Sequence, residues 1–157
     1  MKSKSVFFFT VWTVVFLITA WAAAALASGP QWTPYTKGLE LAREQGKNVM
    51  INFYSDDCKF CRKMDAETFQ DQAVSEFLDR HFVSIKVNTS KARDLSAAYY
   101  VRGLPTIWFL EAGGEKIAPL PGYVPAPIFL ALLKFVRAKA YEGMTFQEYL
   151  DKGLHEK

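Results

Sequence analysis

Two cysteines, Cys58 and Cys61, closely follow an apolar run at 49–54, and this arrangement constrains the fold more than any other feature of the chain. A short, continuous apolar run is typical of a strand that is buried on both faces, as in a sheet with helices on either side. The cysteines then fall where a helix is expected to begin. The sequence therefore predicts a buried strand whose end delivers a C-x-x-C pair to a helix N-terminus.

Three other uses of such a pair compete with redox chemistry. A structural zinc site needs four ligands, whereas the chain holds two cysteines and two histidines, His81 and His155, the second of them in the C-terminal tail. Covalent haem attachment needs a histidine directly after the second cysteine, and Arg62 stands there. A structural disulfide stays open, although a bridge across three positions closes so short a loop that it constrains the unfolded chain weakly.

A dithiol for disulfide exchange has a physical basis at this position. Unpaired amides and the positive end of the helix dipole favour the thiolate of a cysteine at a helix N-terminus, and the thiolate is the species that attacks disulfides. We therefore expect Cys58 to be the nucleophile. Cys61, one turn deeper in the helix, is expected to resolve the mixed disulfide.

The N-terminus carries a predicted export segment at residues 1–27. Lys2 and Lys4 precede the 21 uncharged residues Val6–Leu26, and the small residues of Ala25-Leu26-Ala27 form a motif that signal peptidase accepts. The apolar run is also long enough to span a bilayer, so a cleaved signal peptide and an uncleaved membrane anchor both stay open. Either way, we expect residues 28–157 to be exported.

The composition excludes several classes of protein. Of 157 residues, 50% are hydrophobic and 22% charged, with a net charge of +3, which is unlike a disordered or collagen-like chain. Removing residues 1–27 leaves 130 residues with 17 Lys and Arg against 16 Asp and Glu. So nearly neutral a chain lacks the basic footprint of a nucleic-acid binder, and its length suits one domain.

Hydrophobic periodicity and turn signals predict alternating helices and strands over the rest of the chain. Gly113-Gly114 marks a late hairpin, and Thr145–Glu148 is a capping box that begins a short terminal helix. These elements indicate an α/β domain with a mixed sheet. The expected helices lie at 35–45, from 58 onward, near 74–81, at 92–100, near 128–136 and after 145, and the expected strands at 49–54, 83–87, 107–110 and 115–120.

The order strand, C-x-x-C, helix and the later segment Gly103-Leu104-Pro105-Thr106 resemble the thioredoxin superfamily over about Tyr35 to Ala138. Residues 46–58 (GKNVMINFYSDDC) and Glu67-Thr68-Phe69 are most similar to the C-terminal thioredoxin-like domain of the thiol:disulfide interchange protein DsbD and to small periplasmic thioredoxins. The resemblance implies a thioredoxin fold over residues 28–157. Helices would flank a mixed central sheet, and a short helical tail would occupy 143–154.

The resemblance also implies where a partner protein binds. Pro105 is expected to form a cis peptide bond beside the cysteines, and the backbone of Leu104 to pair with the partner chain as an added strand. An ordinary proline that opens a strand is the alternative. Lys59 and Phe60, between the cysteines, are expected to contact the partner, with packing of Phe60 against its own domain as the alternative.

Two positions, Asn52 and Asp57, depart from the family pattern, and a third, Asp65, matches the DsbD branch. The family has a buried acid six residues before the first cysteine, where this chain has Asn52, and an amide cannot act as a base. The DsbD branch has a second acid seven residues after the first cysteine. Asp65 stands there, one helical turn beyond Cys61, and we expect it to accept the proton, with a solvated helix residue as the alternative. Asp57 replaces a common Trp, and its carboxylate opposes the thiolate that Lys59 favours, so the redox potential stays open.

These expectations combine into a function. We expect a periplasmic thiol:disulfide oxidoreductase, possessing an inner-membrane anchor if the N-terminal segment is retained, that reduces disulfides of other exported proteins through Cys58 and Cys61. Its re-reduction needs a membrane electron donor of the DsbD type, because the compartment is oxidising. We expect a monomer that uses no organic cofactor, metal or nucleic acid. A disulfide oxidase or isomerase, and a redox-inert binding or assembly module, stay open as alternatives.

Overall fold

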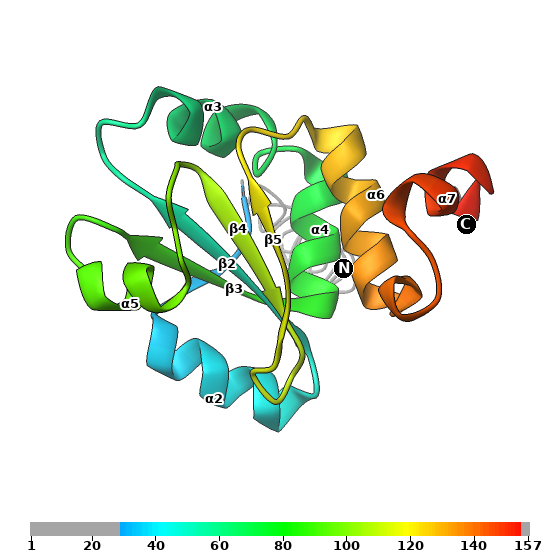
Figure 1. The fold of residues 1–157 in the computed structure, drawn as a ribbon, viewed down its shortest axis with the longest axis horizontal. Coiled ribbons are helices and arrows are strands. Elements are labelled where there is room, and N and C mark those ends of the chain that lie inside the picture. The colour runs from blue at the N-terminus through cyan, green and yellow to red at the C-terminus, as the bar shows by residue number, and fades with distance from the viewer. Residues whose placement is uncertain (1–28, 155–157) are drawn as a thin grey trace, which may run out of the picture.

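The computed structural model describes residues 29–154, and a five-stranded mixed sheet runs through its centre (Figure 1). The strand order is β1-β3-β2-β4-β5. The first three of these strands are parallel to one another, whereas β4 and β5 are antiparallel to their neighbours. The strands span β1 Trp32–Thr33, β2 Asn48–Tyr54, β3 Phe82–Asn88, β4 Thr106–Leu110 and β5 Lys116–Pro121.

Helices cover both faces of the sheet, which confirms the predicted α/β class. One face is covered by α3 Lys59–Glu67, α4 Gln72–His81 and α6 Ala126–Arg137. A 3₁₀ turn at Ala140–Glu142 then leads to α7 Phe146–Asp151, which packs on the outer side of α6 (Figure 1). The other face is covered by α2 Tyr35–Gln45 and α5 Arg93–Ala98. Because both faces are covered, β2 is buried over almost its whole length, as its continuous apolar run predicts.

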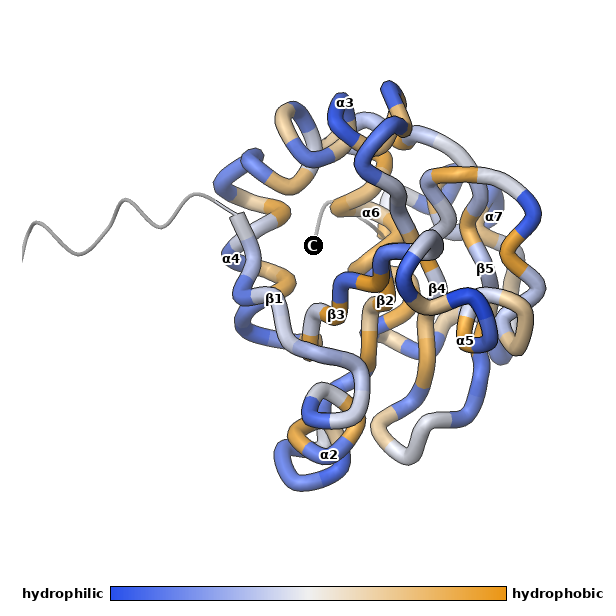
Figure 2. The backbone as a smooth tube through the Cα atoms, turned by 90° about the vertical axis from the view of Figure 1, so that its left-hand side faces the viewer, coloured by the Kyte–Doolittle hydropathy of each residue, from blue (hydrophilic) through white to orange (hydrophobic). Residues whose placement is uncertain are grey.

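Two hydrophobic clusters hold the layers together, one on each face of the sheet. On the α4–α6 face, the ring of Phe129 lies 5.7 Å from Phe69 and 6.4 Å from Phe109, measured between centroids. Figure 2 shows hydrophobic residues along the central strands β2 and β4, and hydrophilic residues on the outer turns of α2. Edge-to-face and tilted aromatic contacts of this kind favour one defined packing arrangement.

Strand β3 differs from what its alternating pattern suggests. Apolar Val83, Ile85 and Val87 face α2 and α5, yet the polar residues between them are not in open solvent. Ser84 is buried, and Lys86 lies under α3 with a side chain only 22% exposed. Alternation shows that a strand has two different faces, but it does not show whether a helix covers the polar one.

The ends of the elements follow local chemistry. Gly46 ends α2 with a left-handed backbone (φ 62°), a conformation that glycine adopts without a steric cost. Thr145 and Glu148 form the predicted capping box of α7, in which each side chain accepts a backbone N–H from the other residue. The two-residue strand β1 was not predicted, because two residues carry no periodicity.

Strand β5 forms one open edge of the sheet and contains two prolines. Pro119 lies opposite Trp108, and Pro121 opposite Thr106. The N–H of Gly122 points toward the β4 side, where it donates to the carbonyl of Pro105 at 2.7 Å. Since successive residues direct their N–H groups to opposite sides of a strand, both proline nitrogens face the open edge. No hydrogen bond to β4 is therefore lost at these positions.

The predicted export segment, residues 1–27, lies outside the described residues. Within residues 29–154, no helix is both long and apolar enough to cross a membrane.

Candidate redox site

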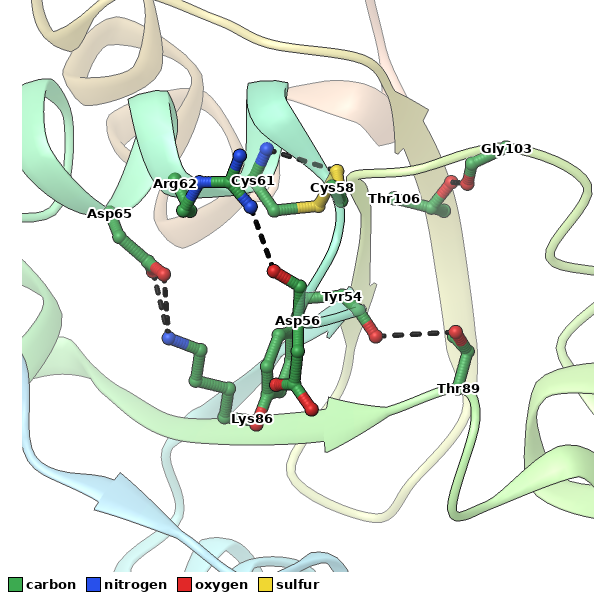
Figure 3. Close-up of a disulfide and its surroundings, with 10 residues drawn as sticks. All are labelled: Tyr54, Asp56, Cys58, Cys61, Arg62, Asp65, Lys86, Thr89, Gly103 and Thr106. Carbon is green, nitrogen blue, oxygen red and sulfur yellow. Dashed lines mark hydrogen bonds and ion pairs between the residues drawn. A yellow bond between two sulfur atoms is a disulfide. The ribbon is translucent and has the colours of Figure 1, made fainter.

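Cys58 and Cys61 form a disulfide at the N-terminus of α3, with their Cα atoms 5.2 Å apart (Figure 3). Cys58 is the N-cap residue, and its Sγ accepts a hydrogen bond from the Cys61 backbone N–H at 3.0 Å. In the reduced protein, this donor and the helix dipole would stabilise a Cys58 thiolate. The structure thus places the pair where the sequence predicts, at the junction of a buried strand and a helix.

The two sulfurs differ in accessibility. Cys58 is half-buried, whereas Cys61 is 2% exposed. An incoming thiol or disulfide can therefore reach Cys58, whereas the rest of the domain shields Cys61. This asymmetry suits the predicted roles of an attacking and a resolving cysteine.

The loop before the pair is held by hydrogen bonds from two elements. Arg62, in the first turn of α3, donates to the carbonyl of Asp56 at 2.8 Å. Asn88, at the end of β3, donates to the carboxylate of Asp56 at 3.1 Å. Asp57 is exposed and forms no ion pair with any described residue. A partner that approaches Cys58 thus meets the hydrogen-bonded backbone of Asp56 and the unpaired carboxylate of Asp57.

The segment before β4 forms the second wall of the site. The peptide bond between Leu104 and Pro105 is cis, and Pro105 is buried while Leu104 is half-buried. The carbonyl of Pro105 accepts from Gly122, which ties this segment to the loop between β5 and α6. Leu104 takes part in none of the loop and turn hydrogen bonds among the described residues. Its backbone is thus available to a partner chain.

Two side chains of the first turn of α3 point into solvent. Lys59 is exposed and makes no ion pair within residues 29–154. Phe60 is 55% exposed, so it does not pack against its own domain as one alternative held. Both side chains are free to contact a partner at Cys58.

Asp65 is bound to Lys86 and is not freely solvated. The Lys86 Nζ lies 2.8 Å from Oδ1 and 2.9 Å from Oδ2 of Asp65, and the two side chains point toward one another in Figure 3. The same Nζ lies 4.7 Å from the ring centroid of Tyr54 and 5.2 Å from that of Trp32. One helical turn beyond Cys61, a carboxylate is thus held in place by an ammonium group that two rings also contact.

A family comparison agrees with this geometry. A model of the thioredoxin-like domain family matches residues 35–137. The chain belongs to the thioredoxin-like family.

The relatives of this thioredoxin-like chain share both sequence and fold. It is 36% identical to the thiol:disulfide interchange protein DsbD of Tatumella citrea over 105 residues, which cover 64% of this chain and 18% of that protein. It is 39% identical to DsbD of Vibrio vulnificus (strain CMCP6) over 98 residues, 59% of this chain and 16% of that protein. The chain therefore spans less than a fifth of the curated relatives that it matches.

A solved thioredoxin from Thermus thermophilus is similar over most of its length. It is 34% identical, has a TM-score of 0.65, and the match covers 71% of this chain and 89% of that one. Together with the cysteine pair, these likenesses support thiol:disulfide oxidoreductase chemistry for the thioredoxin-like domain.

Asn52 is buried within β2 and lacks a full set of partners. It is 1% exposed, its Oδ1 accepts no hydrogen bond from any described residue, and on β2 it lies opposite Lys86 on β3. The Asn52 amide therefore lies next to Lys86 on the neighbouring strand β2. Asp65 approaches Lys86 from α3, which covers this face of the sheet. Of these three side chains, Asp65 and Lys86 are the ionisable ones.

Sequence reasoning missed two contributors to the site. Lys86 was not singled out, since an isolated lysine in an alternating strand usually lies on a solvated face. Tyr123 was also missed. Its hydroxyl donates to Glu67 at 2.6 Å, which raises the pKa of Tyr123, and the Nζ of Lys63 lies 4.4 Å from its ring centroid. These contacts join the β5–α6 loop to α3.

In residues 29–154, no three His, Cys, Asp or Glu side chains cluster as metal ligands.

Proposed function

We propose that this thioredoxin-like domain is a thiol:disulfide reductase that acts on disulfides of other exported proteins through Cys58 and Cys61. The observation that carries the proposal is the asymmetry of the pair. One sulfur is accessible at a helix N-terminus, and the other is almost fully buried behind it. Disulfide exchange begins at an accessible thiolate, and a second thiol close behind it can then attack the mixed disulfide.

The reaction begins with the reduced pair. The Cys58 thiolate attacks one sulfur of the partner disulfide, which forms a mixed disulfide and releases the other partner sulfur as a thiolate that takes up a proton. Cys61 then loses its proton and attacks Cys58 Sγ. The second partner sulfur leaves with a proton, two electrons have passed to the partner, and Cys58 and Cys61 are left as the disulfide seen here.

Three groups assist these steps. Asp65 accepts the proton of Cys61, supported by its place one turn along the same helix and by the Lys86 contact that keeps it there. Leu104 and Pro105 receive the partner chain as an added strand, with Phe60 and Lys59 beside it. The dithiol itself carries the electrons, so the proposed reaction uses no organic cofactor or metal.

The partners follow from the direction of electron flow. Each turnover oxidises the pair, so a dithiol of lower potential must reduce it again. We propose a membrane electron donor of the DsbD type, a periplasmic location, possible anchoring by residues 1–27, and a monomeric state. The likeness to DsbD supports a thiol-redox partner of this kind.

Trapping with matched cysteine variants tests the mechanism. Cys61→Ser leaves the nucleophile without its resolving partner, so mixed disulfides with an added protein disulfide should accumulate. Cys58→Ser should trap none, because Cys61 is buried. If both variants trap equally, the assigned roles of the two cysteines are wrong. If neither variant traps a partner and the wild-type domain fails to reduce insulin disulfides, the proposed function is wrong and the redox-inert binding alternative is favoured.

A redox titration separates the reductase from the oxidase or isomerase. A reduction potential near that of thioredoxin, about −270 mV, fits a reductase, whereas one near that of DsbA, about −120 mV, fits an oxidase. A value near about −180 mV, that of protein disulfide isomerase, fits an isomerase.

A further inference from the structure

The described residues expose three large hydrophobic side chains, one between the cysteines and one in the segment that leads to Pro105. Phe60, between the cysteines, is 55% exposed, and Tyr100 is 77% exposed at the start of the segment that leads to Leu104 and Pro105. The third, Ile128, is on α6. Aromatic residues that are exposed in a free protein are frequent anchors in protein–protein interfaces.

Tyr100 is held in a backbone conformation that its side chain does not favour. Its φ is 52°, in the left-handed region where residues with a Cβ are uncommon. A hydrogen bond from its N–H to the carbonyl of Ala97 fixes it there at 2.9 Å. The Val101 N–H also donates to the Ser96 carbonyl at 3.0 Å, so the left-handed backbone belongs to the turn that ends α5. The ring lies beside the Lys116 Nζ, 5.9 Å from its centroid, and is otherwise open to a partner.

Unpaired cations lie in the chain segments that border the redox site. The loop after β3 lies next to the approach to Cys58, because the Thr89 N–H donates to the Tyr54 carbonyl at 2.9 Å. In residues 56–62 and 89–103, five exposed cations form no ion pair with any described residue, against the three exposed carboxylates of Asp56, Asp57 and Asp94. The five are Lys59, Arg62, Lys91, Arg93 and Arg102.

We propose that Tyr100 and Arg102 form, with the rim of unpaired cations, a docking surface for protein partners that carry carboxylates beside their reactive disulfide. The proposal deepens the proposed function and rests on it. Tyr100 acts as an anchor away from the sulfurs, and Arg102 pairs with partner carboxylates next to it. Opposite charges across such a surface raise the association rate and select among partners.

The dimensions allow one partner to reach both places. Pro105 follows Tyr100 by five positions, so the two lie within about 17 Å of each other. An ordinary protein interface of about 800 Å² per partner is roughly 30 Å across. A partner whose disulfide reaches Cys58 can therefore cover Tyr100 as well.

Two disulfide peptides of matched sequence provide the probe. Each is about twenty residues long, which is enough to reach Tyr100 from a central disulfide, and the flanks carry glutamates in one and lysines in the other. For the wild-type domain, we expect kcat/KM to be about tenfold higher on the acidic peptide at low salt, and the preference to shrink at high salt. Equal rates on both peptides, or a preference for the basic one, would overturn the proposal.

The variants separate docking from chemistry. Tyr100→Gly removes the ring while suiting the positive φ, so the urea midpoint should not fall, yet kcat/KM on the acidic peptide should drop about tenfold, as for loss of an anchor. Arg102→Glu should reverse the charge preference. The control Ile128→Ala removes the third exposed apolar side chain and should leave kcat/KM unchanged on both the acidic and the basic peptide. An acidic-peptide rate that is unchanged in Tyr100→Gly refutes the anchor.

Hydroxyethyl disulfide, which is small and uncharged, keeps the two proposals apart. Wild type, Tyr100→Gly and Arg102→Glu should all reduce it at the same rate, because it cannot span the docking surface. If the wild-type domain does not reduce it, the proposed function fails. If the domain reduces it but shows no charge preference between the peptides, the docking surface alone fails.

Discussion

Replacing Lys86 with methionine tests whether Asp65 works in the second step of exchange. The ammonium group lies 2.8 Å from the Asp65 carboxylate, and the two side chains are 22% and 36% exposed. At that exposure, solvent screening reduces the contribution of such a pair to the free energy of unfolding to about 1 kcal/mol, far below the unscreened Coulomb value. Each of the two ring contacts adds about 0.5 kcal/mol. Because methionine refills part of the space, we expect a loss of about 1–2 kcal/mol in the free energy of unfolding.

The kinetic effect should be confined to one step. Without Lys86, the Asp65 side chain is free to rotate away from Cys61, and loss of about 1 kcal/mol of positioning slows resolution about fivefold. The first attack, by Cys58, should keep its rate. Rapid acid quenching followed by mass spectrometry measures both, since the mixed disulfide then forms at the normal rate and persists longer.

A double-mutant cycle supplies the decisive comparison. Asp65→Asn should lengthen the lifetime of the mixed disulfide at least as much as Lys86→Met, and the double variant no more than Asp65→Asn alone. If the two effects add in full, Lys86 does not act through Asp65 and the reasoning is refuted. Lys139→Met is the matched control, because it breaks a similar pair with Glu111 at 3.0 Å without touching the redox site.

Three further predictions concern stability. Phe129→Ala removes a fully buried ring and should lower the free energy of unfolding by about 3–5 kcal/mol in urea titrations, whereas Ile128→Ala on the same helix should cost less than about 0.5 kcal/mol. Burial and nearby cations lower the pKa of His81, so the unfolded chain binds its proton more readily. The free energy of unfolding should then rise with pH up to about 6.5, and His81→Gln should flatten that rise. Thr145→Ala removes the cap of α7 and should cost about 1 kcal/mol, visible as faster amide exchange in α7 with unchanged disulfide reduction; unchanged exchange would count against the capping role.

Much of the fold was predictable because local patterns agree with the tertiary structure. The continuous apolar run of β2 required cover on both faces, and the sheet provides it. The capping box at Thr145 begins α7 as expected, since its hydrogen bonds involve only residues within one turn. Cys58 is at a helix N-terminus for the same local reason.

What the sequence concealed depends on contacts between distant segments. Asp65 and Lys86 are 21 positions apart, and their pairing requires α3 to lie over β3. Trp32 gave no signal of its own, yet the fold brings it to Lys86.

The prolines of β5 have a consequence for how copies of this domain behave when crowded together. A second chain that approached along this edge would find carbonyl groups but no amide donors at Pro119 and Pro121, so it could not extend the sheet. At the opposite edge, β1 offers only two residues to pair with. Both edges are thus blunted against intermolecular strand pairing, and a concentrated solution of the folded domain should resist growth into cross-β fibrils through either of them.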